Sequence, residues 1–244
     1  MDLSDVTIAI KTFERPQSLK RLVQSIRCFY PSMPIVIADD SETPRPGTVQ
    51  GLSPVEYWCL PFDLGVSCGR NLLAGGIGSQ YVLMLEDDVE VTEESRIETL
   101  MEGVLWNDFD VVGSAPKDPN GREQHLEAHL LRAGHTIQVQ PVQTETPTAV
   151  DFTDNCFLAR TDTLRAVRWD DQQKTVDHLD FFLRCQQKGV RVGYVPGFHL
   201  LHHSDRSSRY NRFRVERSGY YQQRLLDQWG LTSIEGRIHI SGLT

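Results

Sequence analysis

Three consecutive carboxylates, Glu86, Asp87 and Asp88, directly follow the apolar run Tyr81–Leu85. Like charges this close cannot all ionise at low cost unless a cation lies beside or between them. Carboxylate oxygens suit hard divalent ions such as Mg²⁺ and Mn²⁺, which commonly bridge a protein to the phosphates of a substrate. The alternative is a solvated helix start, because residues 92–100 read as the beginning of a helix and acidic side chains favour that end. The triplet therefore indicates either a metal site or an acidic helix cap.

Polar side chains also follow the other apolar runs of the first half. Thr12 and Arg15 come after the first run, and Asp39 ends the second. Arg70 opens a helix after a turn that contains glycine, and a helix N-terminus favours an anion. Each of these residues alone is also typical of a turn. Together they could contact the base, the ribose and the phosphates of a nucleotide.

The elements that must position these residues are the alternating strands and helices of a parallel α/β sheet. Apolar residues at helical spacing predict a first helix that begins near Pro16 and ends before Pro31, and residues 63–78 read as a turn with glycine that leads into a second helix. The expected strands are short apolar runs, at residues 6–13, 34–41, 55–61 and 81–91. Ligands of such sheets bind at the carboxyl ends of the strands. The polar residues named above should therefore gather at one edge.

The second half of the chain is less regular. Its expected strands lie at residues 109–116, 152–161 and 190–197, and its expected helices at residues 95–107, 177–189 and 219–230. Residues 116–149 have little periodicity, which indicates loops or a hairpin. There is no internal repeat and no low-complexity linker, so we expect one domain over residues 1–244.

The composition excludes several classes of protein. A net charge of −8 argues against general nucleic-acid binding, which needs a basic face. No apolar run approaches the roughly 20 residues that span a bilayer, and the first residues are acidic where a secretory signal would be cationic. The five cysteines are odd in number and show no CxxC pairing, which is typical of reduced thiols. We therefore expect a cytoplasmic protein with at most a peripheral membrane contact, or a lumenal one if the sequence is an excised catalytic domain.

The blocks "TIAIKTFERP", "VIADDS", "LGVSCGRN", "LMLEDDVEV", "DNCFLART" and "DHLDFFLR", in this order, resemble family 2 glycosyltransferases with the A-type glycosyltransferase fold. The resemblance is closest to the β-1,4-N-acetylgalactosaminyltransferase group. It implies a Rossmann-like, mostly parallel sheet flanked by helices, with a small acceptor-side subregion. It also implies a UDP-sugar donor and a divalent metal, Mn²⁺ or Mg²⁺.

The same resemblance implies roles for individual residues. Thr12, Arg15 and Asp39 would line the uridine pocket, and Arg70 matches the arginine of the family's turn. Asp88 would be the main metal ligand of the acidic triplet, and Asp87 would lie near the ribose or the sugar. Relatives often have aspartate where this chain has Glu86, which leaves the role of that longer side chain open.

Asp180 lies where the family places its catalytic base. Inverting sugar transfer requires an acceptor hydroxyl to lose its proton while it attacks the anomeric carbon, and a carboxylate within hydrogen-bond reach can accept that proton. The alternative is that Asp180 only stabilises a helix start. Asp177, one turn earlier on the same helix face, is the second choice for the base.

A histidine after the last strand completes the metal site in the related enzymes. His203 matches that position best, and His202 is the alternative. The arginine-rich segment that follows, with Arg206 and Arg209, is either a solvated basic face, a membrane contact or a lid that excludes water from the diphosphate. Asn155 and Trp169 are candidates for the acceptor side, and both could equally be structural.

These observations predict a metal-dependent inverting glycosyltransferase that moves GalNAc or a related hexose or hexosamine from a UDP-sugar to the hydroxyl of a glycan, glycolipid or other acceptor. Residues 1–113 would bind the nucleotide-sugar, and residues 114–244 would bind the acceptor and supply the lid and a final helix. The alternatives are a catalytically inactive nucleotide-sugar-binding or scaffold subunit, and a nucleotidyltransferase. The latter should carry a glycine-rich, lysine-bearing phosphate loop, whereas "AIKTFERP" has no glycine.

Overall fold

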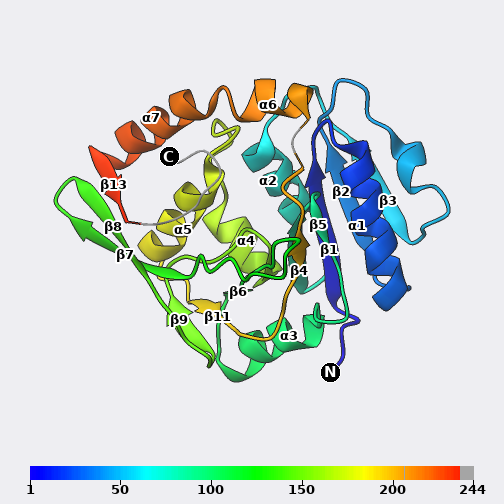
Figure 1. Ribbon diagram of the computed structural model, residues 1–244, viewed down its shortest axis with the longest axis horizontal. Helices are drawn as coiled ribbons and strands as arrows, with labels where there is room; N and C mark the ends of the chain where they lie inside the picture. The colour runs from blue at the N-terminus through cyan, green and yellow to red at the C-terminus, as the bar shows by residue number, and fades with distance from the viewer. Residues whose placement is uncertain (206, 237–244) are drawn as a thin grey trace.

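The computed structural model describes residues 1–205 and 207–236, and its centre is an eight-stranded sheet with the order β3-β2-β1-β4-β10-β6-β11-β9 (Figure 1). The strands are β1 (Val6–Thr12), β2 (Ile35–Asp39), β3 (Val55–Cys59), β4 (Tyr81–Glu86), β6 (Val111–Gly113), β9 (Thr148–Val150), β10 (Phe157–Arg160) and β11 (Val192–Tyr194). The pairs β1–β2, β2–β3, β1–β4 and β6–β11 are parallel. β10 runs antiparallel to both β4 and β6, and β9 antiparallel to β11. The prediction of a mostly parallel α/β sheet is confirmed.

Helices cover both faces of this sheet. One apolar core joins the sheet to α1 (Pro16–Phe29) and α3 (Ile97–Trp106). A second core joins the opposite face to α2 (Val66–Gly76), α4 (Thr161–Val167) and α5 (Asp177–Gln187). Side chains of β4 alternate between the two cores, because successive residues of a strand point to opposite faces. A sheet buried on both sides explains why its strands read as continuous apolar runs.

The helix predicted after Pro16 is confirmed. Proline stands at its first position, where a missing N–H costs no hydrogen bond. Four of its apolar side chains, Leu19, Leu22, Val23 and Ile26, are buried against the sheet, whereas Phe29 at its end is exposed. The helix ends at Phe29, two residues before Pro31. The helix thereby fixes residues 13–15, which connect it to β1, at the carboxyl edge of the sheet.

Smaller elements surround the sheet. The hairpin expected within residues 116–149 is confirmed: β7 (Ala128–Ala133) and β8 (Thr136–Pro141) pair antiparallel, and β13 (Ser233–Glu235) joins them. A turn of 3₁₀ helix, η1 (Pro46–Val49), lies between β2 and β3. Two further helices, α6 (Ser208–Arg214) and α7 (Ser218–Trp229), run across the top of the molecule as viewed in Figure 1.

The single strand predicted over residues 81–91 is interrupted at the acidic triplet. β4 ends at Glu86, a turn holds Asp87 and Asp88, and the short β5 (Val89–Glu90) follows. β5 pairs antiparallel with β12 (Leu201–His202), from far along the chain. The turn therefore presents carboxylates at the edge of the sheet and brings a histidine-bearing strand beside them.

Strands from both predicted halves of the chain alternate within the one sheet, since β10 lies between β4 and β6. Among residues 1–205 and 207–236, none of the helices combines the length and the apolar composition that crossing a bilayer requires.

Candidate active site

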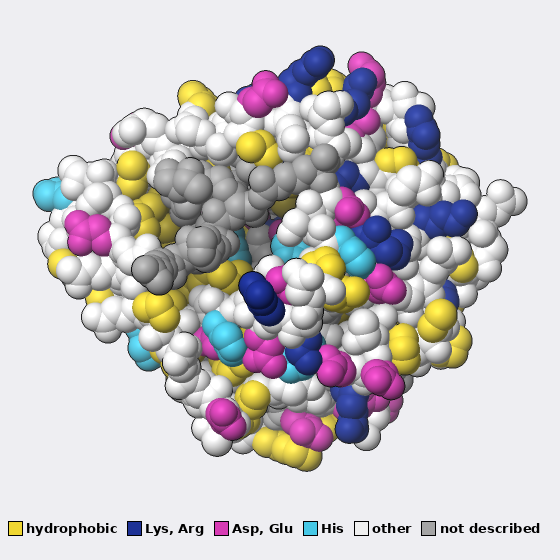
Figure 2. Space-filling view, in the orientation of Figure 1, with side chains coloured by type: hydrophobic (Ala, Val, Ile, Leu, Met, Phe, Trp, Pro, Cys, Tyr) yellow, Lys and Arg dark blue, Asp and Glu magenta, His cyan; other side chains and the backbone are white. Residues whose placement is uncertain are grey.

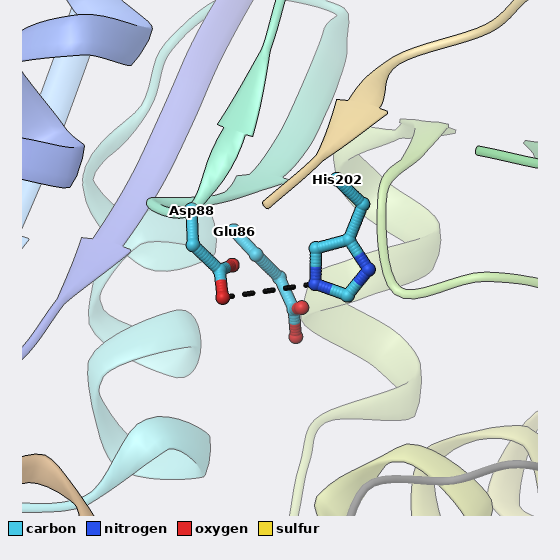
Figure 3. A group of neighbouring side chains, drawn as sticks. All are labelled: Glu86, Asp88 and His202. Atoms are coloured by element: carbon cyan, nitrogen blue, oxygen red, sulfur yellow. Dashed lines mark ion pairs between the residues drawn. The ribbon is translucent and has the colours of Figure 1, made fainter. Parts of the chain in front are cut away.

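Glu86, Asp88 and His202 converge at the carboxyl edge of the sheet. Each offers one ligand atom, and these three atoms lie within 4.8 Å of one another (Figure 3). The antiparallel pairing of β12 with β5, in which His202 lies opposite Val89, positions the imidazole. Two carboxylates and an imidazole form a donor set suited to a divalent metal such as Mn²⁺. The structure thus gives the long side chain of Glu86 a place in the group.

His203, the first choice from the sequence, lies elsewhere. Its Nε2 is 2.8 Å from the Oε2 of Glu90, and its backbone N–H donates to the carbonyl of Asp88. Neighbouring residues in an extended strand point to opposite sides, so only one of the two histidines can face the acidic group. The structure corrects that first choice in favour of the alternative, His202.

Arg15 supplies positive charge to Glu86, Asp87 and Asp88, which we call the acidic turn. Its Nη1 donates to the Oδ2 of Asp88 at 2.7 Å, and its Nη2 donates to the Oδ1 of Asp87. Thr12 donates its hydroxyl to the other oxygen of Asp87 at 2.6 Å. Both oxygens of Asp87 are therefore occupied, whereas the Oδ1 of Asp88 is buried without a partner. Thr12 and Arg15 thus contact the acidic turn in this structure, and their expected place in a uridine pocket stays a prediction.

The electrostatics of the group follow from burial and from Arg15. Burial raises the pKa of the Asp87 carboxyl, and the charge of Arg15 offsets this only in part. Burial would also raise the pKa of Asp88, but Arg15 and His202 outweigh it and the pKa is lowered. Burial opposes the charged form of His202, yet Asp88, whose Oδ2 lies 3.6 Å from its Nε2, and the nearby carboxylates raise its pKa to about 9. Asp88 is thus the carboxylate held most firmly in its charged form.

Arg70 connects the acidic turn to the start of α5. Its side chain is 1% exposed, its Nη1 donates to the Oδ2 of Asp177 at 2.5 Å, and its Nη2 lies 3.4 Å from the Oε1 of Glu86. Asn155 donates to the same oxygen of Glu86 at 3.2 Å. Burial raises the pKa of Asp177, and Arg70 lowers it by a smaller amount. Asp177 is therefore part of the site, linked to Glu86 through one guanidinium.

Asp180, the first choice for the base, lies outside the group of Glu86, Asp88 and His202. Its Oδ2 accepts from the Nε of Arg184 at 2.7 Å, and its Oδ1 accepts from Gln228 and from the indole of Trp229. The side chain is 2% exposed. A carboxylate whose two oxygens are both engaged in this way fastens α5 to α7 and is poorly placed to receive a substrate proton.

Asp39 ends β2 beside the carboxyl end of β1. Its Oδ1 accepts the backbone N–H of Ser41 at 2.9 Å, and its Oδ2 accepts the hydroxyl of Tyr57. The side chain is thus fixed at the edge where the sequence predicted the nucleotide. Its neighbour Asp40 is buried and pairs with Lys11 and Arg214.

Trp169, a candidate for the acceptor side, and Arg209 of the predicted lid lie in different surroundings. Trp169 is 2% exposed and stacks on Phe181 with centroids 4.2 Å apart, so it belongs to the core and the acceptor-side role is corrected. Arg209 pairs with Glu14 at 2.9 Å and with Glu42. Arg206 lies outside the described residues.

Asp154 is a residue of this region that sequence reasoning did not single out. Burial and the charge of Glu86 raise its pKa to about 6, and it also senses His202. It precedes β10, which runs antiparallel to β4. In an antiparallel strand the residues before the strand reach the edge that the other strands reach at their ends. Asp154 in "TDN" could therefore be recognised as a candidate site residue only with knowledge of the direction of β10.

Comparisons with known proteins show the family of this chain. The sequence profile described as "Glycosyl transferase family 2" matches residues 7–168. β-1,4 N-acetylgalactosaminyltransferase 1 of Homo sapiens is 37% identical over 190 residues, covering 73% of this chain and 35% of that protein. β-1,4 N-acetylgalactosaminyltransferase 2 of Mus musculus is 34% identical over 207 residues, covering 81% and 39%. The chain thus spans between a third and two fifths of the length of these curated relatives.

Solved structures share the fold. Residues 1–349 of S. aureus TarS in complex with UDP-GlcNAc superpose with a TM-score of 0.67 at 15% identity, covering 92% of this chain and 66% of that one. The same protein in complex with UDP gives a TM-score of 0.61. Similarity at this level of identity concerns the fold.

Proposed function

The chain belongs to glycosyl transferase family 2 and has the A-type glycosyltransferase fold, and from this premise we propose that it transfers a sugar from a UDP-sugar to an acceptor hydroxyl with inversion at the anomeric carbon. The names of the relatives favour GalNAc as the sugar. The UDP and UDP-GlcNAc complexes of TarS support a UDP-linked donor. The acceptor is a glycan, a glycolipid or another hydroxyl compound.

The observation that carries the proposal is the convergence of Glu86, Asp88 and His202 beside Asp177. The buried and unpartnered Oδ1 of Asp88 is the kind of atom that a bound cation would satisfy. These three side chains would hold Mn²⁺ or Mg²⁺. When bound, such an ion would neutralise charge on the diphosphate leaving group.

We assign the general base to Asp177. The acceptor hydroxyl must attack from the face opposite the diphosphate, and its proton would move to the carboxylate of Asp177. Arg70 donates to that carboxylate and also lies beside Glu86, so it fixes the base relative to the acidic turn. Positioning of this kind supplies much of the rate in transfer reactions.

The remaining residues would bind the donor and the acceptor. Asp39, fixed at the end of β2, would contact the uridine or ribose. Asn155 has a side-chain oxygen that is buried without a partner, so it could accept a hydrogen bond from a sugar. Residues 207–217, which we call the covering segment, contact Glu14, Arg15 and Asp40. They would exclude water from the diphosphate.

Stereochemistry tests the proposal without knowledge of the acceptor. Slow hydrolysis of α-linked UDP-GalNAc in the presence of Mn²⁺ uses water as the acceptor, and proton NMR identifies the first anomer of GalNAc released. We expect the β anomer. The α anomer would contradict inversion. Mn²⁺-dependent binding of the donor without any hydrolysis or transfer to a panel of glycans would favour the inactive binding subunit.

A further inference from the structure

Arg15 is held by two parts of the molecule at once. One part is the acidic turn, where the guanidinium bridges Asp87 and Asp88. The other is the chain around the covering segment: the same Nη1 that contacts Asp88 donates to the carbonyl of Asp205 at 3.0 Å, and the guanidinium lies 4.1 Å from the centre of the Tyr210 ring. Arg15 therefore connects the acidic turn directly to the covering segment.

Asp205 is fixed from a second direction. Its carboxylate accepts from Ser18 at 2.7 Å and from Arg21, both on α1. Because Arg15 directly precedes the first residue of α1, the helix start, Asp205 and the acidic turn form one connected set of polar contacts. If the Nη1 of Arg15 moved, the carbonyl of Asp205 would lose its hydrogen bond to that atom. The carboxylate of Asp205 would remain bound to Ser18 and Arg21.

The rest of the covering segment is attached without Arg15. Arg214 pairs with Asp63 at 2.8 Å and with Asp40 at 3.1 Å. The ring of Phe213 packs against Phe13 and Phe62 with centroids 5.7 and 5.2 Å apart. Figure 2 shows Lys and Arg side chains concentrated over the upper right of this face, the part that α6 and α1 occupy in Figure 1. Loss of the Arg15 contacts would thus loosen the start of α6 while leaving its far end in place.

A cation bound through the free Oδ1 of Asp88 would lie next to the guanidinium of Arg15, which holds the other oxygen of the same carboxylate. Arg15 occupies the Oδ2 of Asp88, and two positive charges a few ångströms apart repel each other in a site shielded from water. The bond from Nη2 to Asp87 can persist, because it uses a different carboxylate. The contact that this repulsion weakens most is the one from Nη1 to Asp88, and the same Nη1 donates to Asp205.

We propose that Arg15 is a resident countercation that a divalent metal displaces from Asp88, and that this displacement loosens the contact of Arg15 with Asp205 and Tyr210. Metal binding thereby loosens the covering segment before the donor binds. The inference rests on the metal site of the proposed function and adds a positioning role for Arg15, distinct from the uridine contact expected from the sequence.

The first test is the affinity for Mn²⁺ in the absence of nucleotide, measured by electron paramagnetic resonance of the free ion. Removal of the competing charge in Arg15→Gln should tighten Mn²⁺ binding by about tenfold, the effect of about 1.4 kcal/mol. Arg15→Lys keeps the charge but cannot bridge two carboxylates, so a smaller gain is expected. The matched control is Arg209→Gln, which removes contacts of the covering segment to Glu14 and Glu42 and leaves the competing charge of Arg15 in place; because loosening is coupled to metal binding, its Mn²⁺ affinity should rise, but by less than in Arg15→Gln.

Equal or weaker Mn²⁺ binding in both Arg15 variants would overturn the inference while leaving the metal site standing. Absence of Mn²⁺ binding in every protein, even with saturating UDP, would overturn the metal site itself and the inference with it. Thermal melting checks that the variants are folded, and if Arg15→Gln is not, Arg15→Lys alone decides by the sign of its change.

The second test is hydrogen exchange of the backbone amides of residues 207–211. In the wild type, Mn²⁺ alone should accelerate their exchange, and in Arg15→Gln their exchange should be the same with and without Mn²⁺. Arg209→Gln should exchange faster at the outset but keep the response to Mn²⁺. A wild-type segment that does not respond to Mn²⁺ would contradict the communication that we infer.

Discussion

At the scale of single residues, neighbouring side chains of the same type have different surroundings. Asp177 and Asp180 lie one turn apart on α5, yet the first contacts Arg70 at the sheet edge and the second contacts Arg184, Gln228 and Trp229. The sequence "DHLDFF" predicted a carboxylate base from this helix and offered both residues. Only the positions of α2 and α7 distinguish them, and these follow from tertiary packing that the spacing within one helix does not contain.

The two aspartates are a matched pair for mutation. Asp177→Asn should reduce sugar transfer by roughly 10²–10⁴, the range that a positioned base supplies, while UDP-sugar affinity changes little. Asp180→Asn should mainly lower the free energy of unfolding, by about 1–3 kcal/mol, because buried donors lose a charged acceptor. Transfer rates, calorimetric affinities and urea unfolding measure the three quantities. The reverse pattern would return the base to Asp180.

The adjacent histidines form a second pair. His202→Ala should weaken Mn²⁺ binding in the presence of UDP by at least about tenfold, since even residues behind the ligands commonly contribute that much. His203→Ala should have a smaller effect, because its ring contacts Glu90. Titration of each variant with Mn²⁺ makes the comparison. A larger loss in His203→Ala would mean that the ring at position 203 turns toward the site when metal binds.

At the scale of the elements, apolar periodicity predicted α1, α2, α3, α5 and α7 and most strands of the large sheet. It missed β12 and joined β5 to β4 as one strand; these two strands, each two residues long, bring His202 to the acidic turn. Strands so short carry no periodic signal. The periodicity predicted no helix over residues 208–214, because α6 is held by ion pairs such as Arg214–Asp63 more than by an apolar face.

α5 provides a prediction about pH. Its residue His178 is buried, and burial lowers its pKa from 6.5 to about 3, so the folded protein holds it neutral. The unfolded chain takes up a proton below the ordinary pKa, so folding stability falls as the pH decreases. We expect a loss of about 2 kcal/mol from this residue between about pH 8 and pH 5.

His178→Gln can still donate to the carbonyl of Thr153, the partner of the imidazole, and does not titrate. Urea unfolding at several pH values should therefore show a steeper pH dependence in the wild type than in this variant. Parallel curves for the two proteins would contradict the buried neutral state of His178.

At the scale of the whole molecule, the division into a nucleotide half and an acceptor half does not correspond to separate folding units. β10, from the second half, pairs with β4 from the first. Its absence would expose the apolar edge of the large sheet, and exposed edges of this kind favour aggregation. The order of the elements along the sequence could not reveal this pairing. β4 and β6 are each parallel to their other neighbour in the sheet, whereas β10 runs antiparallel to both.

A fragment of residues 1–113 should therefore fail to fold cooperatively. Its thermal melt, followed by circular dichroism, should lack the sigmoidal transition of the full chain. A cooperative transition in the fragment would show that the first half holds a complete core, and the interleaved sheet would then be dispensable for its folding.

The most direct test of the central claim is calorimetric titration of UDP-GalNAc into the wild type and into Asp88→Asn, each with Mn²⁺ and with EDTA. Asp88→Asn keeps the size of the side chain and removes the charge on which the group of Glu86, Asp88 and His202 depends. We predict binding that requires Mn²⁺ in the wild type and is weakened by at least about tenfold in the variant. Equal affinity in Mn²⁺ and EDTA, unchanged in Asp88→Asn, would contradict a metal-dependent glycosyltransferase site at this edge of the sheet.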